Sequence, residues 1–264
     1  MSPKAEVYRC PSCRGNLTET SHGYWCSSCD VDYPETETYV DFLPNQAKQT
    51  PGSLTESFFE IIPPLYENIY FPLLYRLGTL PAFDSPADHA RKLVERTSTQ
   101  NGVVLDVACG TGLLSRQLAE KNEDVFALDR SRGMLTEAHE RTPPTLSDRL
   151  NYCHGDAFHL PYGTGVFDAV TCSGAFYLFP DLRKALNEIH RVTNSGGHLA
   201  GMTVIKNGLL STRLTDSLLT LYNQIENFQV HTVDGFAKSL RETGFRKFDY
   251  SIYGSVMLFT AVKS

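Results

Sequence analysis

Short apolar runs alternate with segments of helical spacing through the middle of the chain. Residues 103–107 (VVLDV) are a short, largely β-branched run, which is typical of a buried parallel strand. A Gly-Thr-Gly turn at 110–112 follows, and residues 113–121 then have helical spacing. A second strand-like run, 125–128, ends in Asp129. This order of strand, glycine turn and helix predicts backbone N–H groups that face a ligand.

The end of the chain has a different pattern. Two strand-like runs, residues 247–254 and 255–263, meet at a Gly-Ser junction. Before them, residues 206–230 carry leucines at a roughly helical period. We expect this insertion to form a cap helix.

Composition narrows the class of protein. The chain has 264 residues, of which 41% are hydrophobic and 20% are charged, and this excludes a wholly disordered, collagen-like or coiled-coil chain. The formal charge of −6 disfavours generic binding to polyanions. No stretch approaches the ~18 apolar residues of a membrane span, and the N-terminus lacks an apolar signal region. We therefore expect a cytoplasmic protein.

Four of the seven cysteines lie in the first thirty residues, as two C-x2-C pairs separated by twelve residues. Two such pairs can face each other as a tetrahedral site of four thiolates, which suits a structural Zn²⁺ ion. Two disulfides, a redox C-x-x-C, or His22 in place of one thiolate are the alternatives. The pattern predicts a zinc ribbon over residues 1–44, with the ligands Cys10, Cys13, Cys26 and Cys29.

The charge of this ribbon limits its role. Residues 1–44 contain three basic and seven acidic residues, a formal charge of −4. Such a module is a poor reader of a phosphate backbone. Docking of a protein partner or covering of an active site fits the charge better, and plain structural support is the alternative.

Asp129 follows the glycine turn at an informative distance. It lies nineteen residues beyond Gly110, where an acidic side chain is placed to bind ribose hydroxyls. Position 115 is Ser, so the third glycine of a dinucleotide fingerprint is missing. The pattern therefore favours a nucleoside ligand without pyrophosphate over a nicotinamide dinucleotide.

Five segments together carry a family resemblance. They occur in the order and at the spacings of the motifs of class I S-adenosylmethionine (SAM)-dependent methyltransferases, and the catalytic part resembles the ubiquinone and menaquinone group. The segments are LDVACGTG (105–112), FALDRSRGML (126–135), HGDAFHLPY (154–162), VFDAVTCSGAFYLFPD (166–181) and EIHRVTNSGG (188–197). Ser195 departs from the Pro-Gly-Gly of many relatives. The resemblance implies an α/β, Rossmann-like seven-stranded sheet with helices on both faces over 101–264, ending in an antiparallel strand.

The resemblance also implies residue roles in SAM binding. The methionine end of SAM would be held near the glycine turn, the ribose at the second strand, the adenine at the third, and the sulfonium beside the end of the fourth. In that order, the residues are Asp106, Gly110 and Gly112; Asp129; Met134, Asp156 and Ala157; and Ser173 with Gly174. Carboxylates near a bound cation are electrostatically favourable.

The segment between the ribbon and the strand-like run at 103–107 is expected to determine which substrate binds. Residues 45–100 comprise a polar linker and then an apolar, aromatic stretch broken by prolines, which predicts short helices over the pocket. Tyr66 and Tyr70 are four residues apart and share one helical face. We expect them to line the substrate pocket, with ordinary core packing as the alternative.

No residue stands out in the sequence as the general base that an oxygen or nitrogen acceptor can require. Methyl transfer from a sulfonium is an in-line displacement, so positioning supplies much of the catalysis. Tyr177 follows the fourth strand, and His231 precedes the last helix-like segment. These two are the candidate catalytic residues.

The apolar, aromatic cap favours a hydrophobic or aromatic small molecule as methyl acceptor. Ribosomal-RNA guanine methyltransferases also carry an N-terminal zinc ribbon, and the YVDFLP that follows this one resembles their start. Two features argue against an RNA substrate: the ribbon is acidic, and the sequence has no concentrated basic stripe. Arg91, Lys92 and Arg96 form only a modest basic cluster. The remaining hypotheses are a protein substrate and a SAM-binding protein with a scaffold or other non-methylating role, such as a cyclase.

Overall fold

A computed structural model describes residues 6–44, 60–70, 85–97, 99, 101–206 and 229–264. The expected linker and most of the expected cap helix at 206–230 lie outside these residues. None of the described helices is long and apolar enough to cross a membrane.

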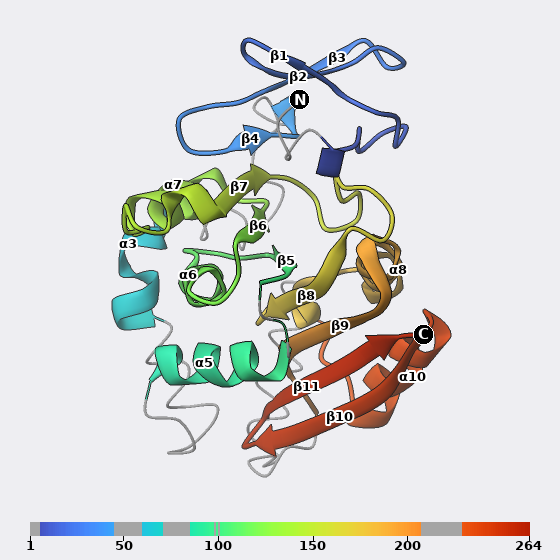
Figure 1. Ribbon diagram of the computed structural model, residues 1–264. Coiled ribbons are helices and arrows are strands. Elements are labelled where there is room, and N and C mark those ends of the chain that lie inside the picture. The colour runs from blue at the N-terminus through green and yellow to red at the C-terminus, as the bar shows by residue number, and fades with distance from the viewer. Residues whose placement is uncertain (1–5, 45–59, 71–84, 98, 100, 207–228) are drawn as a thin grey trace.

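Within the described residues, eight strands form one twisted central sheet (Figure 1). Their order across the sheet is β10-β11-β9-β8-β5-β6-β7-β4. Their bounds are β4 (Val40–Asp41), β5 (Val103–Val107), β6 (Asp124–Asp129), β7 (Leu150–His154), β8 (Phe167–Ser173), β9 (Thr193–Val204), β10 (Phe245–Tyr253) and β11 (Val256–Lys263). Strands β4 to β9 pair in parallel, so their carboxyl ends lie at one edge. Strand β11 runs antiparallel between β9 and β10, which confirms the predicted closing pair.

Helices cover both faces of the sheet, as expected. Each face has its own hydrophobic cluster: Leu118 and Leu135 pack on one side, and Leu186 and Phe236 on the other. The helices of the first face are α5 (Pro86–Thr97), α6 (Leu113–Ala119) and α7 (Arg132–Glu140), and those of the second are α8 (Leu182–Val192) and α10 (Val233–Glu242). The shorter helical turns are α3 (Pro63–Leu65), η2 (Tyr66–Tyr70), η3 (Ser147–Arg149) and η4 (Phe176–Leu178).

Local capping sets where several helices begin. The hydroxyl of Ser131 accepts the backbone N–H of Met134 at the start of α7, and Asp181 accepts that of Lys184 at the start of α8. Thr232 caps α10 in the same way. These side chains satisfy N–H groups that the first helical turn leaves without a partner.

The N-terminal ribbon joins the sheet instead of standing apart from it. Its strands β1 (Thr18–Thr20), β2 (Gly23–Cys26) and β3 (Val31–Pro34) form a small antiparallel sheet at the top of Figure 1. Strand β4 then pairs with the edge strand β7. The ring of Tyr8 packs against Phe126 and Tyr162, with centroids 5.7 and 5.8 Å apart. The seven expected strands are therefore present with an eighth, which covers an edge that would otherwise expose unpaired backbone groups.

Gly112 is the glycine of the turn whose replacement we expect to cost most. It has φ +78, and a Cβ there would lie 2.9 Å from Tyr152 Oη and 3.1 Å from Ala138 Cβ. Gly196 has the same φ of +78 and no heavy atom within 4 Å of its Cβ position, so it isolates the backbone effect. Without ligand, Gly196→Ala should lower the free energy of unfolding by about 1 kcal/mol. Gly112→Ala should cost about 1–3 kcal/mol more, because overpacking is added. Equal losses in urea unfolding would contradict the steric account.

Candidate functional site

The turn after β5 brings backbone N–H groups to the end of β6. Ala108, Gly110 and Gly112 have φ of 56°, 55° and 78°, which reverses the chain before α6. The Gly110 N–H donates to Asp129 Oδ2 at 2.7 Å, and the Ser131 N–H donates to Oδ1 at 2.9 Å. Burial raises the pKa of Asp129, and these backbone hydrogen bonds oppose the rise. A carboxylate is thus held at the carboxyl ends of two adjacent strands.

Asp106 is 1% exposed and lies beneath this turn. Ser115 Oγ donates to its Oδ2 at 2.7 Å, and Thr171 Oγ1 donates to its Oδ1 at 2.8 Å. Burial raises the pKa of Asp106 to about 6, hydrogen bonds from Ser115 and Thr171 act against the rise, and the charge of Asp129 adds to it. The side chain of Asp106 therefore links β5 to β8 and α6. A cation bound nearby would favour its ionised form.

The residues expected near adenine lie around the carboxyl ends of β6 and β7. Met134 is buried in the first turn of α7. Asp156 Oδ1 accepts the Phe158 N–H at 3.0 Å, and its neighbour Ala157 is also buried. The structure places these three residues on the same edge of the sheet as Asp129. Their adenine-binding roles stay predictions.

A histidine that the sequence did not single out lies at the end of β8. His89 Nε2, from α5, lies 3.3 Å from Ser173 Oγ. Burial, and then the charge of Lys92, lowers the pKa of His89 to about 3, so the ring is neutral near pH 7. A neutral ring places no repelling charge beside the expected position of the sulfonium. The two residues are 84 positions apart, and no local pattern indicates the pair.

The candidate catalytic residues also occupy this edge. Tyr177 is half-buried in η4, directly after β8, and its carbonyl accepts the Gln229 N–H at 2.8 Å. His231 pairs with Ile205 at the end of β9, and its Nε2 is buried without a hydrogen-bond partner among the described residues. Burial, and then Lys206, lowers the pKa of His231. Both residues lie at the edge of the sheet where SAM is expected to bind, and their catalytic roles stay predictions.

The helical segment at 60–70 is fixed to the glycine turn by one carboxylate. Glu67 Oε1 accepts Thr111 Oγ1 at 2.6 Å, and Arg116 contacts both carboxylate oxygens at 2.9 and 3.0 Å. The described part of the predicted cover contains the helical turns α3 and η2. Tyr66 lies partly buried beside Glu67, and the side chain of Tyr70 lies outside the described residues. Their pocket-lining roles stay predictions.

The four N-terminal cysteines gather at one point of the ribbon. Their Sγ atoms all lie within 4.8 Å of one another. The Cys10–Cys29 and Cys13–Cys26 distances are 3.8 and 3.6 Å. A tetrahedral ion with Zn–S bonds of about 2.3 Å places its sulfurs about 3.8 Å apart, whereas a disulfide requires about 2.0 Å. The donor set and its spacing fit a zinc ion.

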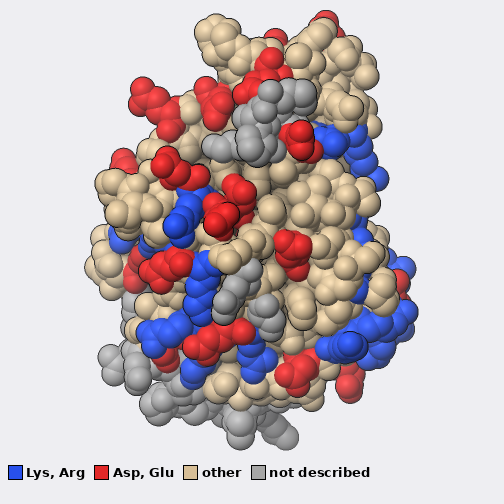
Figure 2. Space-filling view, viewed as in Figure 1, with Lys and Arg blue, Asp and Glu red and all other residues tan. Residues whose placement is uncertain are grey.

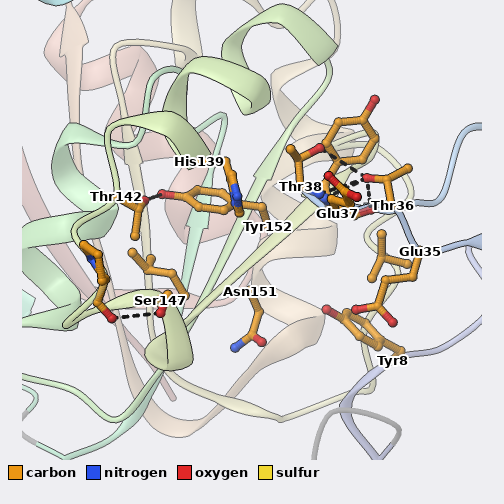
Figure 3. A pocket seen from close by; sticks show the side chains of 14 residues that line it. Tyr8, Glu35, Thr36, Glu37, Thr38, His139, Thr142, Ser147, Asn151 and Tyr152 are labelled. Atoms are coloured by element: carbon orange, nitrogen blue, oxygen red, sulfur yellow. Dashed lines mark hydrogen bonds between the residues drawn. The ribbon is translucent and has the colours of Figure 1, made fainter.

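A cavity of about 400 Å³ lies away from this edge, between the ribbon and α7 (Figure 3). Glu35, Thr36 and Glu37 line one side, and His139 and Tyr152 line the other. None of the residues expected to bind SAM lines it. Asn151 also lines it, and the two polar atoms of its amide are buried without a hydrogen-bond partner among the described residues.

The chain is similar in sequence to known methyltransferases. Residues 105–201 match a methyltransferase domain family. An uncharacterised chloroplastic methyltransferase of Arabidopsis thaliana is 26% identical over 98% of this chain and 79% of its own. The demethylmenaquinone methyltransferase of Renibacterium salmoninarum is 44% identical over 96 residues, which span 36% of this chain and 38% of that enzyme.

Residues 105–201, which contain the glycine turn and Asp129, are thus similar to a methyltransferase domain. A solved structure, the [4+2]-cyclase SpnF, shares its fold with a TM-score of 0.62 and 18% identity, over 79% of this chain and 94% of that one. The match to the Renibacterium enzyme covers well under two thirds of its length. The common part is therefore the methyltransferase fold and its motifs.

The raised pKa of Asp106 makes a prediction for this methyltransferase domain. The positive groups of SAM favour the ionised carboxylate, so binding should release a proton. SAM affinity should rise as pH increases from about 5 through about 6, by up to about tenfold per unit, and level off near pH 7. Calorimetric titrations at several pH values measure this, and Asp106→Asn should bind more weakly and with a smaller dependence on pH. An affinity of the unmodified protein that is flat over the same range would contradict the charge role of Asp106.

Proposed function

We propose that this chain transfers the methyl group of SAM to a hydrophobic or aromatic small molecule. The observation that supports it most is the carboxylate of Asp129, held by the Gly110 N–H where two parallel strands end. Asp129 would bind the ribose, the glycine turn and Asp106 the methionine end, and Met134, Asp156 and Ala157 the adenine. SAM supplies an already activated methyl group, so the chain mainly orients the acceptor for in-line attack.

Charge favours this acceptor class over RNA. In Figure 2, acidic side chains are spread over the upper part of the molecule, where Figure 1 shows the ribbon. On α5, Arg91 forms an ion pair with Asp88 at 3.3 Å, and Arg96 donates to Ser251 at 2.7 Å. Two of the three basic residues that the sequence offered for RNA therefore have partners within the protein. The likeness to demethylmenaquinone methyltransferases supports an aromatic, apolar acceptor.

Two other functions are outcomes of the same test. A ribosomal-RNA guanine methyltransferase would use the ribbon as a recognition module. A SAM-binding protein without methyl transfer is the other, and the likeness to the SpnF cyclase supports keeping it in the test.

The experiment incubates the protein with methyl-labelled SAM and an extract of the source cells, then separates RNA, protein and organic-soluble fractions. We expect label in the organic fraction, with Asp129→Ala as the inactive control. Label in RNA or protein would refute the small-molecule proposal. SAM binding without label in any fraction would support the non-methylating role.

We also propose that Cys10, Cys13, Cys26 and Cys29 hold one structural zinc ion. Four thiolates leave no open coordination position, so the ion would support the ribbon and take no part in the chemistry.

Elemental analysis should find one zinc per chain in the purified protein. Cys26→Ser should lower the zinc content and the unfolding temperature, because metal binding contributes to folding in small modules. Cys109→Ser, outside the cluster, should keep the metal. A zinc-free protein with two disulfides between these cysteines would refute the site.

A further inference from the structure

A buried charged cluster joins the end of the ribbon to the end of β7. Strand β4 pairs with β7 so that Asp41 lies opposite His154. Asp41 Oδ1 lies 2.7 Å from His154 Nδ1, and Oδ2 accepts Arg132 Nη2 at 2.9 Å. Burial opposes ionisation of Asp41, but hydrogen bonds from His154 and from the Leu43 N–H outweigh it and lower its pKa. Asp41 and His154 are 7% and 3% exposed.

His154 carries the contact onward to the turn that contains Asp129. Its second ring nitrogen, Nε2, lies 2.9 Å from the carbonyl oxygen of Arg130. The Arg130 carbonyl and the Asp41 carboxylate both accept hydrogen bonds, so each ring nitrogen of His154 faces an acceptor. The ring is thereby fixed in orientation between the ribbon and the residue that follows Asp129.

The same cluster also reaches the start of α7. Arg132 is the first residue of α7 and Met134 lies in its first turn. Asp41 thus holds the turn after β6 by two routes. It contacts His154, whose ring contacts the Arg130 carbonyl, and it binds the Arg132 guanidinium directly. The glycine turn holds the turn after β6 by a third route, through the Gly110 N–H.

We propose that Asp41 is a positioning residue for SAM: the last strand of the ribbon holds the Asp129 turn in its ligand-binding geometry. This proposal rests on the proposed SAM site. Preorganisation of a binding group lowers the cost of ordering it when the ligand binds. The ribbon would therefore support the ribose end of the site, although none of its residues is among those expected to bind SAM.

The test compares two acid-to-amide variants at the seam between ribbon and catalytic domain. Asp41→Asn removes the charge that holds His154 and Arg132. Glu188→Gln is the matched control, because Glu188 is 5% exposed and binds Arg14 of the ribbon at 3.0 Å, and its other partners are Arg191 and the Leu160 N–H. Calorimetry measures SAM affinity, and elemental analysis and thermal unfolding are measured on the same samples.

We expect Asp41→Asn to weaken SAM binding about tenfold while the zinc content stays at the wild-type level. Glu188→Gln should lower the unfolding temperature and leave SAM affinity unchanged. Wild-type SAM affinity in Asp41→Asn, or an equal loss in both variants, would overturn the proposal. If Asp41→Asn does not fold, Arg132→Gln decides, because its side chain is 35% exposed. A loss of about threefold is expected there, and no loss would overturn the proposal.

Asp129→Ala separates this proposal from the proposed function. Weak SAM binding by Asp129→Ala together with normal binding by Asp41→Asn would remove only the positioning role. Normal SAM binding by Asp129→Ala would remove the ribose assignment on which both depend.

Discussion

The hydrogen bond from the Gly110 N–H to the Asp129 carboxylate is the contact on which the site depends. It joins the turn after β5 to the end of β6, and it needs positive φ at Gly110 together with a carboxylate at the last position of the next strand. Parallel pairing of β5 and β6 brings the two ends to the same edge. The strand order across the sheet then places the ends of β7 and β8 beside them, so one edge collects every residue expected to bind SAM.

The ribbon is part of this arrangement, because its strand β4 pairs with β7. A forty-residue module has little apolar surface of its own, and here its aromatic residues share the core beneath the sheet. The four thiolates hold one end of the module, and β4 adds the other end to the sheet. The proposed metal site at one end and the buried carboxylate of Asp41 at the other would therefore fix the position of β4 relative to the ligand edge.

The sequence predicts those parts of the molecule that depend on short-range pattern. The run at 103–107, the glycine turn, the pairing of β10 with β11 and the gathering of the four cysteines all follow from local spacing. Contacts between distant residues leave no such trace. Asp41 and His154 are 113 positions apart and Glu67 and Thr111 are 44 apart, and no local pattern links the two members of either pair. The same holds for β4, whose two residues are too few to show strand periodicity.

A crystal structure with bound S-adenosylhomocysteine would test the central claim most directly, because it locates the ligand without any assumption about the acceptor. The account predicts ribose hydroxyls on the Asp129 carboxylate, adenine beside Met134, and the sulfur near Ser173. A ligand bound elsewhere, such as in the cavity between Glu37 and His139, would contradict it.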